Sequence, residues 1–229
     1  NGLNGSRWGI RMAEDLGAGW LVGGVLESGF DVSQGSSFQG GRLFGRQAYL
    51  FLDSKTLGNL RLGRQYVLSD SLLGYGAPFG TGMGLLGNPS TSVNNNGRNV
   101  ATMLNPSRAD NVVQYTTPNF AGFTGALQYA PDENTADDFF GAAVNYNRGP
   151  VNVGVSYEWN KQRLSPNDQV NKTLSVGANY DFGFLKLLAA YQQVSDLRVS
   201  ANGIAGGVAQ RLVGEGARTL TIDDQDAWV

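Results

Sequence analysis

The chain has 229 residues, of which only 16% are charged, and it contains neither histidine nor cysteine. Without these two residue types, catalytic triads, thiolate sites and the usual zinc sites cannot be built, so we expect neither an enzyme nor a cofactor or metal protein. The formal net charge of −2 argues against a nucleic-acid partner bound by bulk electrostatics.

Apolar and polar residues are finely interleaved from the N-terminus onward. Over residues 6–12 one face carries Trp8, Ile10 and Met12, and the other carries Arg7 and Arg11. Period-two alternation of this kind predicts a strand with two different faces. No apolar run reaches the roughly 18 residues that a membrane-spanning helix needs. Such strands are typical of a membrane β-barrel, in which one face meets lipid and the other meets water.

A second arginine-rich strand is predicted over residues 42–49. Its alternation places two groups on opposite faces, namely Arg42, Phe44 and Arg46 against Leu43 and Tyr49. The two arginines on the first of these faces would therefore point in the same direction.

The longest irregular stretch runs from about Val67 to Pro106 and is rich in Gly, Pro and Asn. A structureless segment of this length inside a compact domain is normally functional. Tyr75 and Phe79 lie within it. We expect them to pin the segment to the rest of the protein, and the alternative is a stacking rail for a solute such as a sugar.

From residue 108 onward, alternating segments recur at short intervals. The clearest is 151–158, with three valines and a tyrosine on one face against Asn, Gly, Ser and Glu on the other. Tyrosines close the apolar side of several segments, as expected at a membrane–water boundary: Tyr115, Tyr129, Tyr146, Tyr157, Tyr180 and Tyr191. Short turns are predicted at 147–150 and 181–183, on the periplasmic side, and long outward loops at 161–172 and 195–218.

Three blocks in order along the chain resemble the porins of β-proteobacteria: residues 4–11 with 14–17 and 26–30, residues 43–49, and residues 60–66. The resemblance implies an all-β, sixteen-stranded transmembrane antiparallel β-barrel in the bacterial outer membrane, in contact with the lipid bilayer and lipopolysaccharide. It also implies a homotrimer and a loop, here residues 67–107, that folds into the barrel and narrows the pore. Residues 1–229 would form a single barrel domain of about eleven strands, incomplete at both ends.

The resemblance further implies an arginine cluster on the wall of the pore constriction. Arg7, Arg46 and Arg108 stand at matching positions, and alternation along its strand also points Arg108 inward. Arg11 and Arg42 are expected to be neighbours of this cluster.

Few carboxylates in the sequence would face these cations. No Asp or Glu occurs between Ser71 and Ala109, and Asp70 and Asp110 flank the gap. We therefore expect weakly opposed arginines and a channel for passive diffusion of small hydrophilic solutes and ions, with a preference for anions. Arg64 has outward parity, so we expect it to anchor a loop or contact another subunit.

Other functions remain open from the sequence. A substrate-specific outer-membrane channel for an organic acid, phosphate or sugar would show saturable flux, whereas diffusion gives a linear one. A structural barrel without an open pore would show no conductance. A soluble β-sandwich lectin or enzyme would be extracted without detergent, and its enzymatic form is weakened by the lack of histidine and cysteine.

Overall fold

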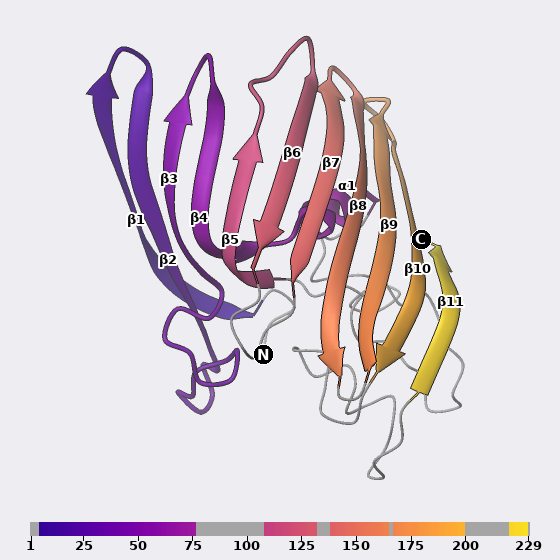
Figure 1. Ribbon diagram of the computed structural model, residues 1–229. Helices are drawn as coiled ribbons and strands as arrows, with labels where there is room; N and C mark the ends of the chain where they lie inside the picture. The colour runs from indigo at the N-terminus through magenta and orange to yellow at the C-terminus, as the bar shows by residue number, and fades with distance from the viewer. Residues whose placement is uncertain (1–4, 77–107, 132–137, 165–166, 200–219, 229) are drawn as a thin grey trace.

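A computed structural model describes residues 5–76, 108–131, 138–164, 167–199 and 220–228 of the chain. Its strands form one curved antiparallel sheet of eleven strands in chain order, and within the described residues this sheet is open from β1 to β11 (Figure 1). The elements are β1 (Ser6–Gly17), β2 (Trp20–Phe30), β3 (Gln47–Ser54), β4 (Gly58–Tyr66), α1 (Leu68–Gly76), β5 (Arg108–Thr116), β6 (Phe123–Ala130), β7 (Phe139–Arg148), β8 (Val151–Leu164), β9 (Asn167–Asp181), β10 (Lys186–Val199) and β11 (Leu220–Trp228). The predicted all-β antiparallel fold is confirmed.

The connections differ in length between the two ends of the sheet. Short turns such as 149–150 and 182–185 lie at the upper end in Figure 1, and the longer connection 31–46 lies at the lower end. The long loop expected at 161–172 is wrong, because β8 and β9 stay paired as far as Leu164 and Asn167. Likewise, β10 continues to Val199. Backbone ladder bonds do not require apolar side chains, so strands rich in Lys, Asn and Gln can continue where the apolar pattern stops.

The two faces of the sheet differ in polarity, as β8 shows most clearly. Val155 is 42% exposed on the outer face, whereas its neighbour Ser156 is only 1% exposed on the inner face. Val153 and Tyr157 are also exposed, and Glu158 is buried. The alternation predicted for residues 151–158 is confirmed, and its polar face is the buried one, the reverse of a soluble protein.

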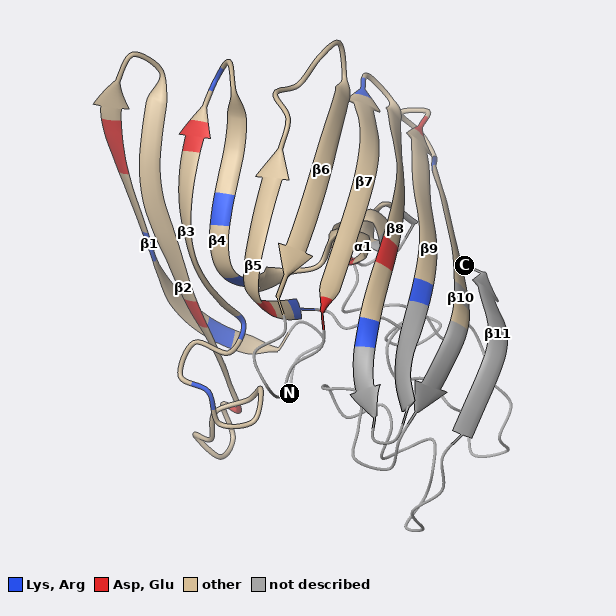
Figure 2. Ribbon diagram, in the orientation of Figure 1, with Lys and Arg blue, Asp and Glu red and all other residues tan. Residues whose placement is uncertain are grey.

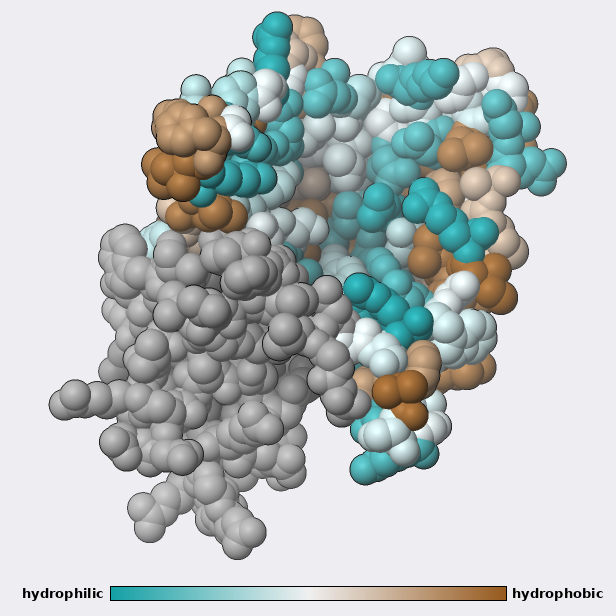
Figure 3. Space-filling model, turned by 180° about the vertical axis from the view of Figure 1, so that it is seen from behind, coloured by the Kyte–Doolittle hydropathy of each residue, from teal (hydrophilic) through white to brown (hydrophobic). Residues whose placement is uncertain are grey.

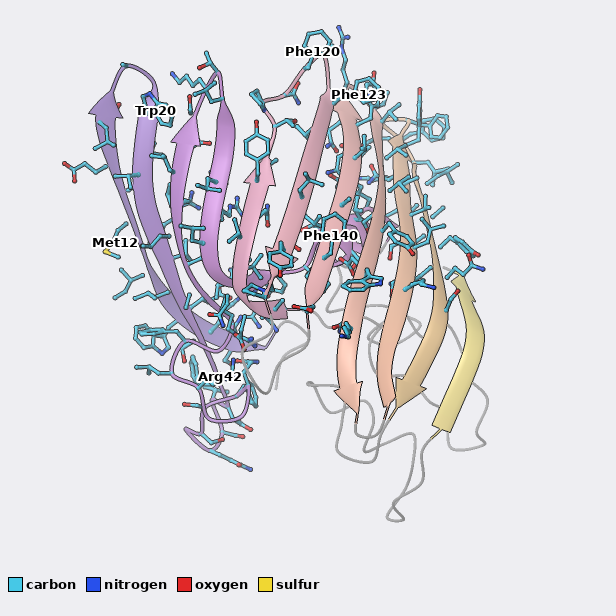
Figure 4. All side chains as sticks on the ribbon, viewed as in Figure 1. Met12, Trp20, Arg42, Phe120, Phe123 and Phe140 are labelled. Carbon is cyan, nitrogen blue, oxygen red and sulfur yellow. The ribbon has the colours of Figure 1, made fainter. Side chains whose placement is uncertain are left out.

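Aromatic side chains occupy two levels of the outer face. Phe120 and Phe123 lie at the short-turn end (Figure 4). Toward the other end, direct cross-strand partners form a row across β6, β7 and β8, consisting of Tyr129, Phe140 and Trp159. Two aromatic levels flanking an apolar band are expected where strands cross the two boundaries of a membrane.

The inner side is hollow and largely hydrophilic. Viewed from behind, its visible surface is mostly teal and white, with hydrophobic residues gathered toward the rims (Figure 3). A small apolar core on this side consists of Val67, Val112, Ala130 and Phe139. It fixes the start of the segment that follows β4 against β5, β6 and β7, and so directs α1 across the inner face. No helical segment among the described residues is both long and apolar enough to cross a membrane.

Candidate functional site

Two arginines from distant parts of the sequence meet at one tyrosine. Arg46 and Arg108 each donate a hydrogen bond from Nη2 to the hydroxyl of Tyr66, at 2.5 and 2.6 Å. The Arg108 guanidinium also lies 4.2 Å from the centre of the Tyr66 ring, a cation–π contact. Arg7 pairs with Gly29, where a Cβ would lie 3.1 Å from Arg46 Cδ, so Arg7 shares a strand face with the Arg46 side chain. We call Arg46, Tyr66 and Arg108 the arginine–tyrosine cluster.

Two carboxylates oppose this cluster. Glu27 on β2 accepts a hydrogen bond from Arg46 Nε at 2.5 Å, and both side chains are largely buried. Asp70, in the first turn of α1, feels the positive charges of Arg108 and Arg46. Burial raises the pKa of Asp70 to about 6, and the two guanidiniums act in the lowering direction without cancelling that rise. The expectation of weakly opposed arginines is therefore wrong for Arg46, because Glu27 lies outside the acid-free segment that suggested it.

A second ion-pair group ties the loop between β2 and β3 to β5. Asp110 binds Arg42 Nη1 at 2.7 Å and Arg64 Nη1 at 2.6 Å, and Arg64 Nε also donates to the carbonyl of Gly45 at 2.7 Å. The role expected for Arg64 as a loop anchor is confirmed. The strand predicted from residue 42 is wrong, because β3 begins only at Gln47.

The reason lies in the residues just before Arg42. Gly40 and Gly41 both have a positive φ, of 71° and 81°. Two consecutive left-handed residues cannot belong to a regular strand, so the chain turns here instead of extending the ladder. As a result, Arg42 is exposed and pairs with Asp110 instead of with the residues of the arginine–tyrosine cluster.

Two further arginines stack on aromatic rings of the inner face. The Arg11 guanidinium lies 5.8 Å from the ring centre of Phe51, and that of Arg61 lies 5.3 Å from the ring centre of Tyr49. The prediction that Tyr49 lies on the face opposite Arg46 is wrong, because its neighbour Leu50 is the outward residue, at 63% exposure. The strand prediction began in a segment that is a turn, so its alternation was counted from the wrong start.

Helix α1 is seated on the inner face of β7 to β10. Glu158 on β8 is buried and accepts two hydrogen bonds of 2.7 Å, from the backbone N–H and from the hydroxyl of Ser69. A carboxylate at the N-terminus of a helix satisfies unpaired N–H groups and complements the helix dipole. Leu72 packs over the paired residues Gly154 and Gly177, where a Cβ would lie 1.9 Å from an atom of Leu72 in each case. At Gly177 that atom is the backbone carbonyl oxygen of Leu72, so glycine there lets the helix approach the wall this closely, whereas at Gly154 it is the tip of the Leu72 side chain.

The far end of α1 is also attached. Asn179 on β9 donates a hydrogen bond to the Tyr75 carbonyl at 3.0 Å, and Tyr75 itself is half-buried. Phe79 lies outside the described residues, so the choice between a pin and a solute rail stays a prediction for it.

The structure thus gathers only part of the expected site. Arg46, Arg108 and Asp70 come together, Arg7 lies on the adjoining strand face, Arg11 stacks on Phe51, and Arg42 belongs to a separate ion-pair group. Sequence reasoning did not identify Glu27 and Tyr66 as partners of these arginines, nor Glu158 as the partner of Ser69 in α1. The available signal was a carboxylate in the polar phase of a membrane strand, which is costly unless it has a partner. In Figure 2, acidic residues lie near the upper ends of β1 and β3, and charged residues of both signs also lie at the lower end of the sheet between β1 and β5.

Metal binding has no support in the described part of the chain. There, no three Asp, Glu, His or Cys side chains converge on a common point.

Comparison with known proteins gives matches along almost the whole chain. The family model described as Gram-negative porin matches residues 1–227. An outer membrane porin protein of Bordetella pertussis is 37% identical over 216 residues, covering 86% of this chain and 54% of that protein. Outer membrane porin protein 32 of Delftia acidovorans is 30% identical, over 99% of this chain and 67% of its own. The chain therefore spans about half the length of the Bordetella relative.

Solved structures of porins are also similar to this chain. An anion-selective porin from Comamonas acidovorans matches with a TM-score of 0.65 and 26% identity, covering 85% of this chain and 59% of its own. A complex of Salmonella typhi OmpF with daunomycin matches with a TM-score of 0.60 over 83% of this chain and 58% of its own. Because its identity is only 19%, the second match concerns the fold alone.

Proposed function

Because the chain belongs to the Gram-negative porin family and lies in the outer membrane as a multi-pass β-strand protein, we propose that it forms the wall of a water-filled channel. Small hydrophilic solutes and ions pass through this channel by passive diffusion, with a preference for anions. The observation that carries the proposal is the inverted polarity of the sheet, with an apolar, exposed outer face and a polar, buried inner face.

The segment at 67–107 narrows the channel in this proposal. The support is the described start of the segment, since α1 is fastened to the inner face by Glu158, by the glycine pair and by Asn179. Asp70 on α1 is then close enough to Arg108 and Arg46 to feel their positive charge. The short turns lie on the periplasmic side, the long connections face outward, and the protein assembles as a homotrimer in contact with lipopolysaccharide.

Anion preference rests on the balance of charges along the inner face. Glu27 and Asp70 offset part of the positive charge at the arginine–tyrosine cluster. Arg7, Arg11 and Arg61 add positive charge along β1 and β4, and no carboxylate lies within ion-pair distance of them in the part of the chain that the structure describes. The anion selectivity of the Comamonas acidovorans porin supports a preference for anions in this chain as well.

A substrate-specific channel for an organic acid, phosphate or sugar is the second candidate. One observation favours its anionic form: Tyr66 holds two guanidiniums next to each other. Planar guanidiniums bind carboxylate and phosphate in a bidentate manner.

Planar lipid bilayers test the proposal. We expect stepwise single-channel currents, a reversal potential in a salt gradient of the sign that anion permeation gives, and flux that rises linearly with solute concentration. Absence of channel steps would refute the porin function, and a reversal potential of the cation sign would refute the anion preference. Saturation of the flux by one solute would favour the substrate-specific channel.

A further inference from the structure

The two stacked arginines of the inner face form a group of their own, apart from the arginine–tyrosine cluster. Arg61 is the direct cross-strand partner of Phe51, and Arg11 lies over the face of that same ring. Arg61 reaches diagonally to Tyr49, two residues before Phe51. Cation and ring therefore alternate across β1, β3 and β4 on one side of the sheet.

A glycine on β2 makes this arrangement possible. Gly23 is the cross-strand partner of Phe51, and a Cβ at Gly23 would lie 2.5 Å from Phe51 Cζ. Any larger residue would push the ring away from the wall. With glycine there, Phe51 lies across β2 and is only 6% exposed, although it belongs to a face that is otherwise polar. The buried ring gives Arg11 a flat, apolar support on the neighbouring strand.

The position of this group along the strands separates it from the cluster. Arg7 shares a strand face with Arg46 of the cluster, and Arg11 follows Arg7 by four residues toward the short turn, a rise of roughly 13 Å at about 3.3 Å per residue. This separation exceeds the Debye length of about 8 Å at physiological ionic strength. An ion that leaves the cluster toward the short-turn end would therefore meet these two charges as a separate step.

Neither side chain has a direct ion-pair partner in the part of the chain that the structure describes. Among the described residues, ion pairs involve Arg42, Arg46 and Arg64, but neither Arg11 nor Arg61. Arg61 Nε donates to the amide oxygen of Asn59 at 2.9 Å, and Asn59 Nδ2 in turn donates to the Asp53 carboxylate at 3.3 Å, so Asn59 orients the guanidinium and stands between it and the acid. Stacking on a ring face leaves the N–H groups at the guanidinium edge able to bind an anion.

We propose that Arg11 and Arg61, supported by Phe51 and Tyr49, form a second anion-binding step on the inner wall. Its ligands are small carboxylate and phosphate anions, which match the planar donor edge of a guanidinium. The inference rests on the proposed channel function and deepens it, because it names residues outside the constriction that set the preference for anions.

Single-channel recording of the full chain in planar bilayers tests the proposal with inorganic phosphate as the probe. The double variant R11Q/R61Q removes both charges, R11K/R61K keeps the charges but removes the planar donor edge, and R148Q is the matched control. Arg148 is exposed at the end of β7 beside a short turn, and it takes no part in this group.

We expect R11Q/R61Q to lower the anion-to-cation permeability ratio by about threefold and to weaken phosphate block of the chloride current by about tenfold, a change of about 1.4 kcal/mol. R11K/R61K should keep the permeability ratio but lose the phosphate block, and R148Q should behave as wild type in both measurements. A double Gln variant that keeps the wild-type ratio and block would overturn the inference, and so would phosphate block that persists in the Lys variant. In either case, conduction by the wild type would leave the proposed channel function standing, whereas a wild type without current would refute that function itself.

Discussion

Removal of the Glu158 carboxylate should release α1 from the inner wall. This side chain accepts two hydrogen bonds from Ser69, and a hydrogen bond to a charged group contributes about 1.5–3 kcal/mol. Glu158→Leu should therefore weaken docking of the helix by at least about 3 kcal/mol. Because about 1.4 kcal/mol corresponds to a factor of ten, the equilibrium between docked and released helix should shift about a hundredfold.

The absence of cysteine from the chain provides a direct assay. Leu72 is 1% exposed beneath the docked helix, so a Leu72→Cys substitution places a single thiol where a water-soluble reagent reaches it only after release. In this background Glu158→Leu should raise the rate of thiol modification about a hundredfold. Glu158→Gln keeps one acceptor oxygen, so its rate of thiol modification should lie between those of the Leu72→Cys background alone and of the Glu158→Leu variant.

Asp53→Asn is the matched control in the same background. Asp53 is also a carboxylate of the inner face, but its hydrogen bond of 3.3 Å comes from Asn59 on the neighbouring strand. Its substitution should leave the rate of thiol modification unchanged. If Glu158→Leu changed the rate no more than Asp53→Asn does, the two hydrogen bonds would not hold the helix and the reasoning would be refuted.

Three other predictions concern pH, packing and the lipid face. Asp70, with a pKa of about 6, is charged above that pH and neutral below it, so the anion preference measured by reversal potential should increase from pH 7.5 to pH 5. The variant Asp70→Asn should show the low-pH anion preference at both pH values. If that variant kept the pH dependence of the wild type, the assignment to Asp70 would be contradicted. Gly177→Ala places a Cβ 1.9 Å from a helix carbonyl oxygen, an overpacking that costs about 1–3 kcal/mol. In the Leu72→Cys background it should therefore speed thiol modification about tenfold. Gly125→Ala, whose Cβ has its nearest contact at 3.5 Å, should leave that rate unchanged. Val155→Arg, on the outer face, should lower the free energy of unfolding in lipid by about 2–4 kcal/mol. Phe184→Arg, at a short turn, should lower it by only about 0–1 kcal/mol. Equal losses of unfolding free energy in the two variants would contradict the placement of the apolar band.

The strands were predictable where one face meets lipid and the other meets the inner side. Between residues 151 and 158 the alternation alone assigns every residue to the correct face, because an error of one residue would place polar groups in hydrocarbon. Beyond the apolar band this constraint disappears. For that reason the polar ends of β8 and β9 resemble a loop in sequence although their backbones remain paired.

Irregularities within strands also limit what alternation can predict. The register shifts between Gly63 and Gln65, and Asn111 on the opposite strand has a φ of 53°. A bulge of this kind places two residues opposite one and changes the parity beyond it. Counting from Tyr115 therefore does not fix the direction of Arg108, and only its contact with Tyr66 does so.

The candidate site was predictable in residue type but not in pairing. The resemblance to porins implied a cluster of arginines, whereas the partners Glu27 and Glu158 depend on which strands and helices meet in space. Glu158 lies 89 residues from Ser69, and no local pattern connects the two. Similarly, Gly154 and Gly177 are ordinary polar-phase residues of two strands until α1 is placed over them.

The seat of α1 also imposes an order on folding. The helix precedes β7 to β10 in the chain, yet Ser69 binds a residue 89 positions later and Tyr75 binds one 104 positions later. Contacts of such sequence separation form only after the intervening loop entropy has been overcome, so the strands that carry them must assemble first. Until then Glu158 can remain hydrated, which spares the nascent wall an unpaired buried charge. Docking of α1 is thus a late event, because a chain synthesised from its N-terminus has no partner for this helix until β8 and β9 have formed.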